Sequence, residues 1–200
     1  MTVAGLVLAA GAGRRMGGPK ALVRDGDGTP WVVRAVRTLA DAGCSPVLVV
    51  VGADATEVGR QLAGEPVTVV EAADWADGMG ASLRAGLAAL SPIDGAVDGP
   101  VAVAVTVVDQ PGLDGAVVRR VAAGAGVETL ARATYSGRPG HPVVLGRVHW
   151  DGARSAAVGD LGARDYLTAH GAVDVECGDL SAGVDVDLPA DLPAGHRLPD

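Results

Sequence analysis

The chain contains, close to its N-terminus, the stretch Leu6-Val-Leu-Ala-Ala-Gly-Ala-Gly-Arg-Arg-Met-Gly-Gly-Pro-Lys20, an apolar run that breaks abruptly into glycines and cationic side chains. An apolar run that is bounded by glycine is typical of a buried strand. In open α/β sheets, ligands bind beyond the carboxyl ends of the strands. The sequence therefore predicts a ligand-binding loop at the end of a buried strand.

The composition of this loop suits a polyphosphate. Glycine adopts backbone angles that are closed to other residues, so successive N–H groups can form a concavity that binds anions. Arginine and lysine add full positive charges, which pair well with phosphate oxygens. The alternative is a glycine-rich turn whose arginines are only solvated. The four glycines are Gly11, Gly13, Gly17 and Gly18, and the three cations are Arg14, Arg15 and Lys20.

Two familiar phosphate-binding loops do not fit this stretch. A P-loop needs lysine and then serine or threonine directly after its second glycine, whereas Pro19 stands there and Ala21 follows Lys20. The dinucleotide fingerprint needs glycine in place of Met16 and an acidic residue about 20 positions further on, and residues 31–35 contain no acid. The stretch therefore does not match the P-loop (Walker A) motif, and a Rossmann cofactor site is disfavoured.

The same stretch resembles the opening motif of a family of nucleotidyltransferases, those similar to the molybdenum cofactor cytidylyl- and guanylyltransferases. That motif reads approximately L-A-A-G-x-G-x-R-M-G-x-x-K, and residues 8–20 match it nearly throughout. The resemblance implies that the loop binds a nucleoside triphosphate and that Arg15 and Lys20 are catalytic, holding the leaving pyrophosphate. The nucleotide-binding residues that it implies in this loop are Leu8, Ala9, Ala10, Gly11, Gly13, Arg14, Gly17 and Lys20.

Length and charge limit the function further. Two hundred residues, of which 48% are hydrophobic and 20% charged, fit one globular domain. The formal net charge of −8 disfavours a protein that binds nucleic acid or an anionic membrane surface. We expect one domain over residues 1–192 and a loose tail over residues 193–200, which is polar and contains proline.

The cysteines and the N-terminus indicate a cytoplasmic protein. Cys44 and Cys177 are too few for a disulfide framework and lack metal-ligand spacing, so both are expected to be thiols in a reducing compartment. The apolar run over residues 3–10 is short and no basic segment precedes it, unlike a signal peptide. No stretch approaches the roughly 20 apolar residues that a membrane span needs.

Strand and helix signals alternate as far as residue 123, which indicates a parallel sheet that is covered on both sides. A β-branched run over residues 101–108 is typical of a central strand. We expect a three-layer α/β/α fold with a mostly parallel, Rossmann-like sheet, and the resemblance implies its nucleotidyltransferase version. Further strands are expected at 46–51 and 67–70, and helices from the Thr29 N-cap to Gly43, at 56–63 and around Leu83, Leu87 and Leu90.

The second half of the chain is less regular. Asp160 is in position to cap a helix over about residues 162–169. Strands are expected at 129–135 and 142–145, joined by a loop over 136–141, and short strands are expected at 173–176 and 184–186.

Asp109 follows the predicted central strand, so its carboxylate is expected at the same sheet edge as the glycine loop. A carboxylate that faces a polyphosphate can hold Mg²⁺, which takes few protein ligands and completes its shell with water and phosphate oxygens. The resemblance agrees, because residues 109–111 resemble the family's D-Q-P motif, whose aspartate binds the catalytic metal. The alternative is that Asp109 only ends the strand and bonds the following turn.

A second metal ligand is expected near the C-terminus. Residues 184–192 resemble the family's late D-x-D-T-P-E-D-L segment. Alternation along a strand puts Asp185 and Asp187 on the same side, so both can face the metal; Asp187 is preferred, with Asp185 close behind. This chain departs from the family pattern at Leu188 and Ala190.

A further segment, residues 75–87, resembles the family's W-x-x-G-M-x-x-S-L-x-x-G-L motif near the nucleotide. It implies that Gly80 and Ser82 bind the nucleotide at a helix start, where N–H groups are free to meet an anion. Met79 is expected in the core. The family commonly has asparagine where this chain has Ala72, which leaves the preferred base open.

Two shorter resemblances imply the acceptor site. Residues 140–142 resemble the family's G-H-P element, and residues 159–164 resemble its G-D-x-G-A-R loop. They imply acceptor-binding roles for His141, Asp160 and Arg164, whose guanidinium suits bidentate recognition of phosphate. The alternatives are a structural histidine and a capped helix with an exposed arginine. Both elements favour the cytidylyltransferase branch over its guanylyl relatives.

The resemblance thus implies an enzyme that transfers a nucleotidyl group from an NTP to a small phosphorylated acceptor and releases pyrophosphate, with Mg²⁺ as cofactor. CTP and molybdopterin are the favoured substrates, and a client molybdoenzyme is the implied partner; no nucleic acid or membrane is expected. Two alternatives stay open. One is a guanylyl- or other NTP transferase with a different acceptor, and the other is a non-catalytic nucleotide-binding or cofactor-delivery protein.

Overall fold

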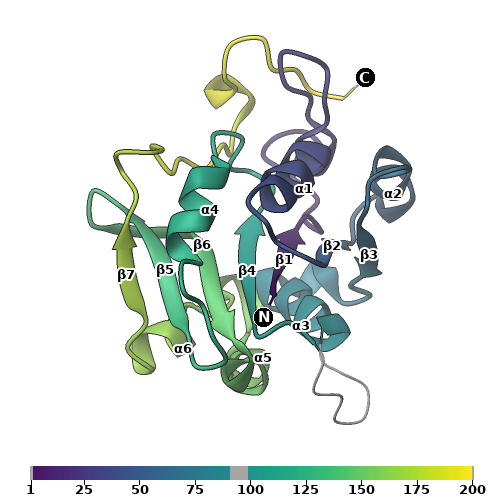
Figure 1. Cartoon of the computed structure of the whole chain (residues 1–200). Helices are drawn as coiled ribbons and strands as arrows, with labels where there is room; N and C mark the ends of the chain where they lie inside the picture. The colour runs from purple at the N-terminus through teal and green to yellow at the C-terminus, as the bar shows by residue number, and fades with distance from the viewer. Residues whose placement is uncertain (1, 91–98, 200) are drawn as a thin grey trace.

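A seven-stranded sheet forms the middle layer of the computed structural model, which describes residues 2–90 and 99–199 (Figure 1). The strands are β1 (Val3–Leu8), β2 (Val47–Val51), β3 (Thr68–Glu71), β4 (Ala102–Val107), β5 (Leu130–Tyr135), β6 (Arg138–Gly146) and β7 (Val173–Glu176). Their order is β3-β2-β1-β4-β6-β5-β7. β6 runs antiparallel to both of its neighbours, and the other pairs are parallel. This mixed, mostly parallel sheet confirms the predicted fold class.

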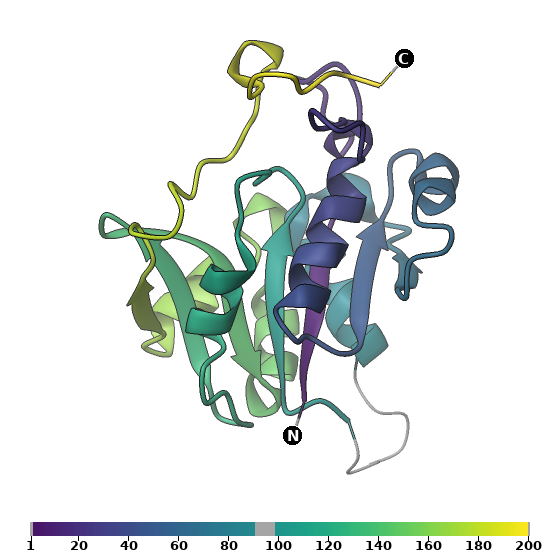
Figure 2. The same cartoon turned by 45° about the horizontal axis from the view of Figure 1, so that its top comes forward.

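Helices cover both faces of the sheet (Figures 1 and 2). On one face lie α1 (Trp31–Asp41), α2 (Ala55–Gln61) and α4 (Gly115–Val121), and on the other lie α3 (Met79–Leu90), α5 (Trp150–Ala156) and α6 (Arg164–Ala169). Single 3₁₀ turns are present at Lys20–Leu22, Trp75–Asp77, Arg147–His149, Gly159–Leu161 and Pro189–Asp191. None of the helices in the described part of the chain is long and apolar enough to cross a membrane.

The core has two halves because side chains alternate along the buried strands. Val7 of β1 and Val49 of β2 belong to the half under α1 and α4, whereas Leu6 and Val50 belong to the half under α3. All side chains of β2 and β4 are buried, as is typical of strands whose two faces are both covered. Burying each valine or leucine contributes about 1.5–3 kcal/mol, so these strands form a rigid scaffold.

The register of the central strands brings the glycine loop and Asp109 together. Leu8, the last residue of β1, pairs with Val107, the last residue of β4. The glycine loop (residues 9–20) follows Leu8 directly, and Asp109 lies two residues after Val107. Both segments therefore leave the sheet at the edge where α/β proteins bind their ligands.

The loop expected over residues 136–141 is instead a tight hairpin. Ser136 and Gly137 have φ angles of 52° and 76°, and two consecutive positive φ values are typical of a type I′ turn. β6 therefore starts at Arg138, ahead of the predicted strand. Two helices also differ from expectation: α5 had no sequence signal, and α1 begins with Pro30, not Thr29, at its N-cap position.

The strand expected at residues 184–186 is not formed, and this part of the chain is irregular. It belongs to a C-terminal strap (residues 177–199) that leaves β7 and crosses towards the start of α1 (Figure 2). The N–H of Val186 donates to the Asp109 carbonyl at 2.9 Å. This bond holds the strap against the end of β4, so a contact with the turn after β4 replaces the expected strand pairing.

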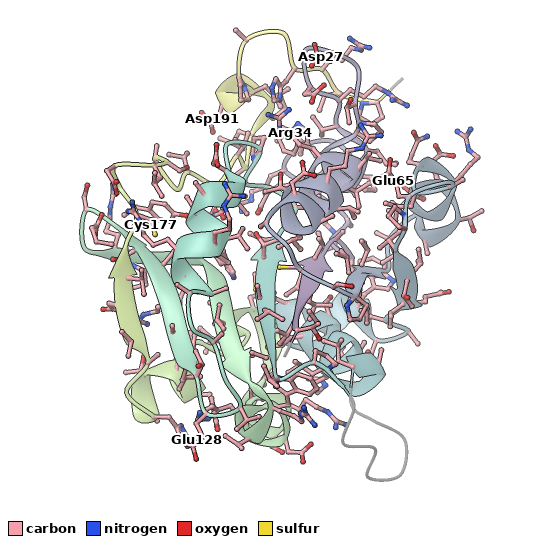
Figure 3. All side chains as sticks on the ribbon, viewed as in Figure 1. Asp27, Arg34, Glu65, Glu128, Cys177 and Asp191 are labelled. Atoms are coloured by element: carbon pink, nitrogen blue, oxygen red, sulfur yellow. The ribbon has the colours of Figure 1, made fainter. Side chains whose placement is uncertain are left out.

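The end of the strap differs from the expected loose tail. Arg197 and Arg24 exchange two main-chain hydrogen bonds of 2.9 Å, and the indole of the buried Trp31 donates to His196 Nδ1 at 3.0 Å. These contacts lie at the end of the molecule where Asp27 and Arg34 are labelled in Figure 3. The strap is therefore anchored at both ends.

Candidate active site

The glycine loop is wound around a single carbonyl group. The Gly13 oxygen accepts three main-chain N–H groups, those of Met16, Gly17 and Gly18, at 2.8, 3.0 and 3.2 Å. Gly13 has a φ of +56°, and a Cβ there would overlap the carbonyl oxygen of Gly18. Met16 is fully buried and ties the loop to the core. Only glycine fits at position 13, so the shape of the loop is set before any ligand binds.

Lys20 lies between two carboxylates beside this loop. Its ammonium nitrogen is 2.8 Å from Asp109 Oδ2 and 2.5 Å from Asp187 Oδ1. Arg15 contacts the second oxygen of Asp187 at 3.0 Å. Residues from the glycine loop, the end of β4 and the C-terminal strap thus form one charged cluster with two positive and two negative groups.

The charges of this cluster reinforce one another. Burial alone would lower the pKa of Lys20, but the hydrogen bonds and charges of Asp109 and Asp187 outweigh burial and raise that pKa. The hydrogen bond from Lys20 lowers the pKa of Asp187. At neutral pH, Lys20 is therefore cationic and Asp187 anionic.

Two groups beside the cluster have pKa values that are shifted mainly by burial. Burial raises the pKa of the Asp185 carboxyl, and the charge of Asp109 adds to this effect. Burial lowers the pKa of His141, so its imidazole is neutral at pH 7. A neutral imidazole has one N–H donor and one acceptor nitrogen, which suits it to a polar ligand.

Two cavities meet at Asp109. The loop cavity, of about 590 Å³, lies against the glycine loop. The sheet cavity, of about 570 Å³, lies between the sheet and residues 160–168. Both volumes are typical of small-molecule sites. The residues that line both cavities are Leu8, Met79, Val107, Asp109, Asp160 and Asp185.

The structure brings most residues of the predicted nucleotide site to the loop cavity. Ala9, Gly17 and Gly80 are not among its lining residues. Ala9 is buried in the core, and a Cβ on Gly80 would lie 2.8 Å from the main chain of Ala157, so Gly80 allows α3 to pack closely against the end of α5. The predicted residues that do line the loop cavity are Leu8, Ala10, Gly11, Gly13, Arg14, Arg15, Lys20 and Ser82.

The residues predicted for the acceptor lie at the sheet cavity. His141, Asp160 and Arg164 all line it. The expected capping role of Asp160 is wrong, because Ala163 occupies the N-cap position of α6 and no side chain caps that helix. Asp160 instead approaches the main chain at Gly78, where a Cβ would come within 2.6 Å of its carboxylate.

Sequence reasoning missed three residues that line the sheet cavity. Met79, expected in the core, is 36% exposed. Gln110 is buried and its side-chain amide donates to Asp185 Oδ1 at 2.8 Å. Arg132 belongs to β5. A charged residue inside an apolar strand is uncommon, so the sequence itself could have indicated Arg132 as a candidate functional residue.

Asp109 and Asp187 are the carboxylates best placed to hold a divalent cation. Both contact the same Lys20 nitrogen, so their oxygens face one point. Within the described residues, there is no group of three or more His, Cys, Asp or Glu side chains arranged for a metal. Mg²⁺ is usually bound by one or two carboxylates together with substrate phosphates, so the donor set fits this ion. A cation here would take the place of Lys20.

Comparison with known families matches residues 5–174 to the MobA-like NTP transferase domain. The chain belongs to the MobA-like NTP transferase family. This membership confirms the resemblance that the sequence motifs indicated. A curated relative, the nicotine blue oxidoreductase of Paenarthrobacter nicotinovorans, is 37% identical over 195 residues, and the match covers 92% of each chain.

Solved structures share the fold of this member of the MobA-like NTP transferase family. A nucleotidyl transferase from Methanothermobacter thermautotrophicus superposes with a TM-score of 0.77 at 23% identity, over 95% of this chain and 94% of that chain. A manganese complex of a protein from Mycobacterium tuberculosis gives a TM-score of 0.71 at 24% identity, over 93% and 94% of the two chains. The fold is therefore that of nucleotidyltransferases.

Proposed function

We propose that this protein transfers a nucleotidyl group from an NTP to a phosphate-bearing acceptor, with CTP and molybdopterin as the favoured pair. The position of Asp109 carries the proposal. It lies on the border of two cavities, with the glycine loop on one side and His141 and Arg164 on the other. A donor in the loop cavity and an acceptor in the sheet cavity would meet at this carboxylate.

The proposed reaction needs positioning and charge neutralisation. An oxygen of the acceptor phosphate attacks the α-phosphorus of the NTP, the bond from that phosphorus to the bridging oxygen breaks, and pyrophosphate leaves with the electron pair. A phosphate group is ionised at neutral pH, so no strong general base is required. Catalysis then depends on holding the reactants in line and stabilising the charge of the leaving group.

Each charged residue has a part in this scheme. The loop amides, Arg15 and Lys20 hold the phosphates that leave as pyrophosphate, and Arg164 binds the acceptor phosphate. Mg²⁺, bound by Asp109 and Asp187, would supply further neutralisation of the reacting phosphate. Lys20 would then turn from the carboxylates to the phosphates, exchanging one set of anionic partners for another.

A second function is favoured by the 37% identity to nicotine blue oxidoreductase. A redox reaction needs an electron donor, and the chain supplies no dithiol, because Cys44 and Cys177 are buried free thiols and burial raises the pKa of Cys44 to about 11. The donor would have to be a diffusible reductant, for which a reduced nicotinamide dinucleotide is the test case, although the glycine loop lacks the dinucleotide fingerprint. Its hydride and one solvent proton would reduce an organic acceptor in the sheet cavity.

The first function is tested by pyrophosphate release with Mg²⁺ and each of CTP, GTP, ATP and UTP, with and without molybdopterin. Asp109→Ala serves as the blank. Release with CTP only when molybdopterin is present supports the proposal. Release with GTP supports a guanylyltransferase, and nucleotide binding without release from any mixture supports a non-catalytic protein or the redox reaction.

The second function is tested by following the oxidation of NADH and NADPH in the absence of air, with a quinoid dye as the acceptor. Oxidation that requires both the protein and the dye, and that is lost in Gly13→Ala, supports an oxidoreductase. Pyrophosphate release together with no oxidation of either dinucleotide excludes it. The two assays use the same preparation, so one protein sample distinguishes the two reactions.

A further inference from the structure

The sheet cavity is lined by a positively charged side chain, that of Arg132, which has no part in the proposed reaction. Arg132 lies on β5, and its side chain is only 17% exposed. Its Nε donates to Asp174 Oδ1 at 2.6 Å, and the two residues are directly paired in the register of β5 and β7. Arg132 lines the sheet cavity, whereas Asp174 does not. The ion pair therefore lies at the cavity wall, with the arginine on the cavity side.

Most N–H donors of the Arg132 guanidinium have no partner in the part of the chain that the structure describes. Arginine has five N–H donors, and within the described residues only Nε of Arg132 has a hydrogen-bond partner. Asp174 is about half exposed, so water weakens its hold on the charge. Four N–H groups on a largely covered side chain can therefore bind an anionic ligand that enters the cavity.

Apolar side chains form part of the wall of the cavity that Arg132 lines. Charged groups are costly to bury without a partner, and Coulomb attraction to an incoming anion is stronger where the surroundings exclude water. A ligand with an apolar body and an anionic end would satisfy both the walls and the guanidinium. The apolar side chains are Leu83, Val105, Val143, Leu145 and Leu167.

Strand register gives the distance between Arg132 and the reacting centre. Arg132 pairs with Val143 of β6, which pairs with Val105 of β4, four residues before Asp109. Two strand spacings of about 4.8 Å and four residues of about 3.3 Å place the Arg132 and Asp109 backbones about 16 Å apart. This separation is long for one small phosphate to contact both residues, but the two ends of a larger molecule can do so.

We propose that Arg132 determines acceptor specificity by binding a second anionic group, at the end of the acceptor remote from the transferred phosphate. The ligand class is a molecule with an apolar body, a phosphate near Asp109 and Arg164, and a carboxylate, phenolate or similar anion at Arg132. The term acceptor rests on the proposed nucleotidyl transfer, whereas the anion site itself does not.

Two fluorescent probes that share an apolar body test the anion site directly. They are 8-anilinonaphthalene-1-sulfonate, which carries a sulfonate, and N-phenyl-1-naphthylamine, which does not. In titrations of the full chain, Arg132→Gln is expected to weaken sulfonate binding about tenfold, the effect of losing one charge-assisted hydrogen bond, and to change binding of the neutral probe less than twofold. Arg132→Lys is expected to restore part of the sulfonate affinity.

Two control variants separate this role from a general loss of charge. Asp174→Asn keeps Arg132 but removes the carboxylate charge that competes with the sulfonate for the guanidinium, so sulfonate binding is expected to be equally tight or tighter. Arg119→Gln removes a guanidinium that bonds the Asp41 carbonyl and does not line the sheet cavity, so neither probe should respond. Equal weakening of both probes in Arg132→Gln, or no change in either, overturns the proposal.

Turnover adds an independent measurement. If pyrophosphate release is observed, Arg132→Gln is expected to raise the KM for the acceptor and to leave the KM for the NTP unchanged; an unchanged KM for the acceptor contradicts the specificity role. If no mixture releases pyrophosphate, the nucleotidyl transfer fails while the probe titrations still decide whether Arg132 forms an anion site.

Discussion

The Lys20 ammonium lies 2.8 Å from the Asp109 carboxylate, at the point where a divalent cation would be held. Lys20 is also the only lysine in the 200-residue sequence. The positive charge of Lys20 thus holds Asp109 and Asp187 together. Under the proposed function, a divalent cation would compete with Lys20 for the same carboxylates, and the first prediction follows from this competition.

Lys20→Met is expected to affect the two ligands in opposite directions. The variant keeps the approximate length of the side chain but removes the Lys20 charge from Asp109 and Asp187, and Asp187 keeps only its contact with Arg15, so Mn²⁺ alone should bind more tightly. Triphosphate binding should weaken about tenfold, because one charge-assisted contact is lost. Calorimetric titration of Mn²⁺ and of CTP measures both effects. Weaker binding of Mn²⁺ would show that Lys20 does not compete with the cation.

The three aspartates should differ in their effect on turnover. Asp109→Asn and Asp187→Asn remove carboxylates of the charged cluster, and each is expected to lower kcat about 10²–10³-fold, as for the loss of one electrostatic group in an active site. Asp185→Asn should cost less, since this carboxylate already accepts the Gln110 amide. Steady-state kinetics measure the loss of kcat in each variant and so rank the three aspartates. Thermal melts serve as the control for folding. A larger loss in Asp185→Asn than in Asp187→Asn would make Asp185 the second metal ligand.

Two glycines of the loop provide a matched pair. Gly13→Ala should destabilise the protein by about 1–3 kcal/mol and abolish triphosphate binding, because its Cβ would overlap the Gly18 carbonyl. Gly17 also has a positive φ, of 92°, but no atom lies within 4 Å of a Cβ there. Gly17→Ala should therefore cost about 1 kcal/mol and keep its affinity for nucleotide. Equal affinities in the two variants would contradict the role of the Gly13 turn.

Acid stability should depend on Glu176. Its carboxylate accepts the N–H groups of Ser136, Gly137 and Gly178, and these bonds lower its pKa from the ordinary 4.5 to about 2. Because the folded pKa is the lower one, the stabilisation is fully present above pH 4.5 and is lost as the pH falls towards about 2. Glu176→Gln should flatten the fall of Tm across this window. Glu128→Gln, at the bottom of the view in Figure 3 and well separated from the labelled Cys177 that follows Glu176, should leave it unchanged.

The end of the C-terminal strap should contribute to stability. His196→Ala removes the acceptor of the buried Trp31 indole and an edge-to-face ring contact with a centroid distance of 5.7 Å. An unsatisfied buried donor costs about 1–3 kcal/mol, so Tm should fall by several degrees. Arg197→Ala keeps its main-chain bonds to Arg24 and should melt close to wild type. Equal Tm values for the wild type and His196→Ala would instead support the loose tail that the sequence predicted.

The parts of the site that sequence predicted correctly are local. The apolar run that ends in glycine predicted β1 and the loop after it, and the β-branched run that ends at Asp109 predicted the central strand β4. Parallel strands end at one sheet edge, so the fold class predicted that Asp109 and the glycine loop lie at the same edge; the pairing of β1 with β4 then brings Asp109 and Lys20 into contact. Family membership is confirmed, whereas the roles of individual residues stay predictions.

The parts that sequence missed depend on contacts between distant segments. Gln110 and Asp185 are 75 residues apart, and no periodicity in either segment predicts their hydrogen bond. His196 carried no signal, because its partner Trp31 is identified only once the strap is placed. The expected strand at 184–186 failed for a related reason: the strap bonds a turn after β4, so its alternating aspartates do not face an adjacent strand.

The C-terminal strap has a consequence for biosynthesis. Asp187 is synthesised 167 residues after Lys20, its partner in the charged cluster. A nascent chain that has completed β6 already contains Lys20 and Asp109 but lacks Asp187, which completes the charged cluster. Under the proposed function, nucleotide chemistry at this centre would therefore wait for the strap, and a chain that is truncated before the strap would be inactive even with its central strands intact.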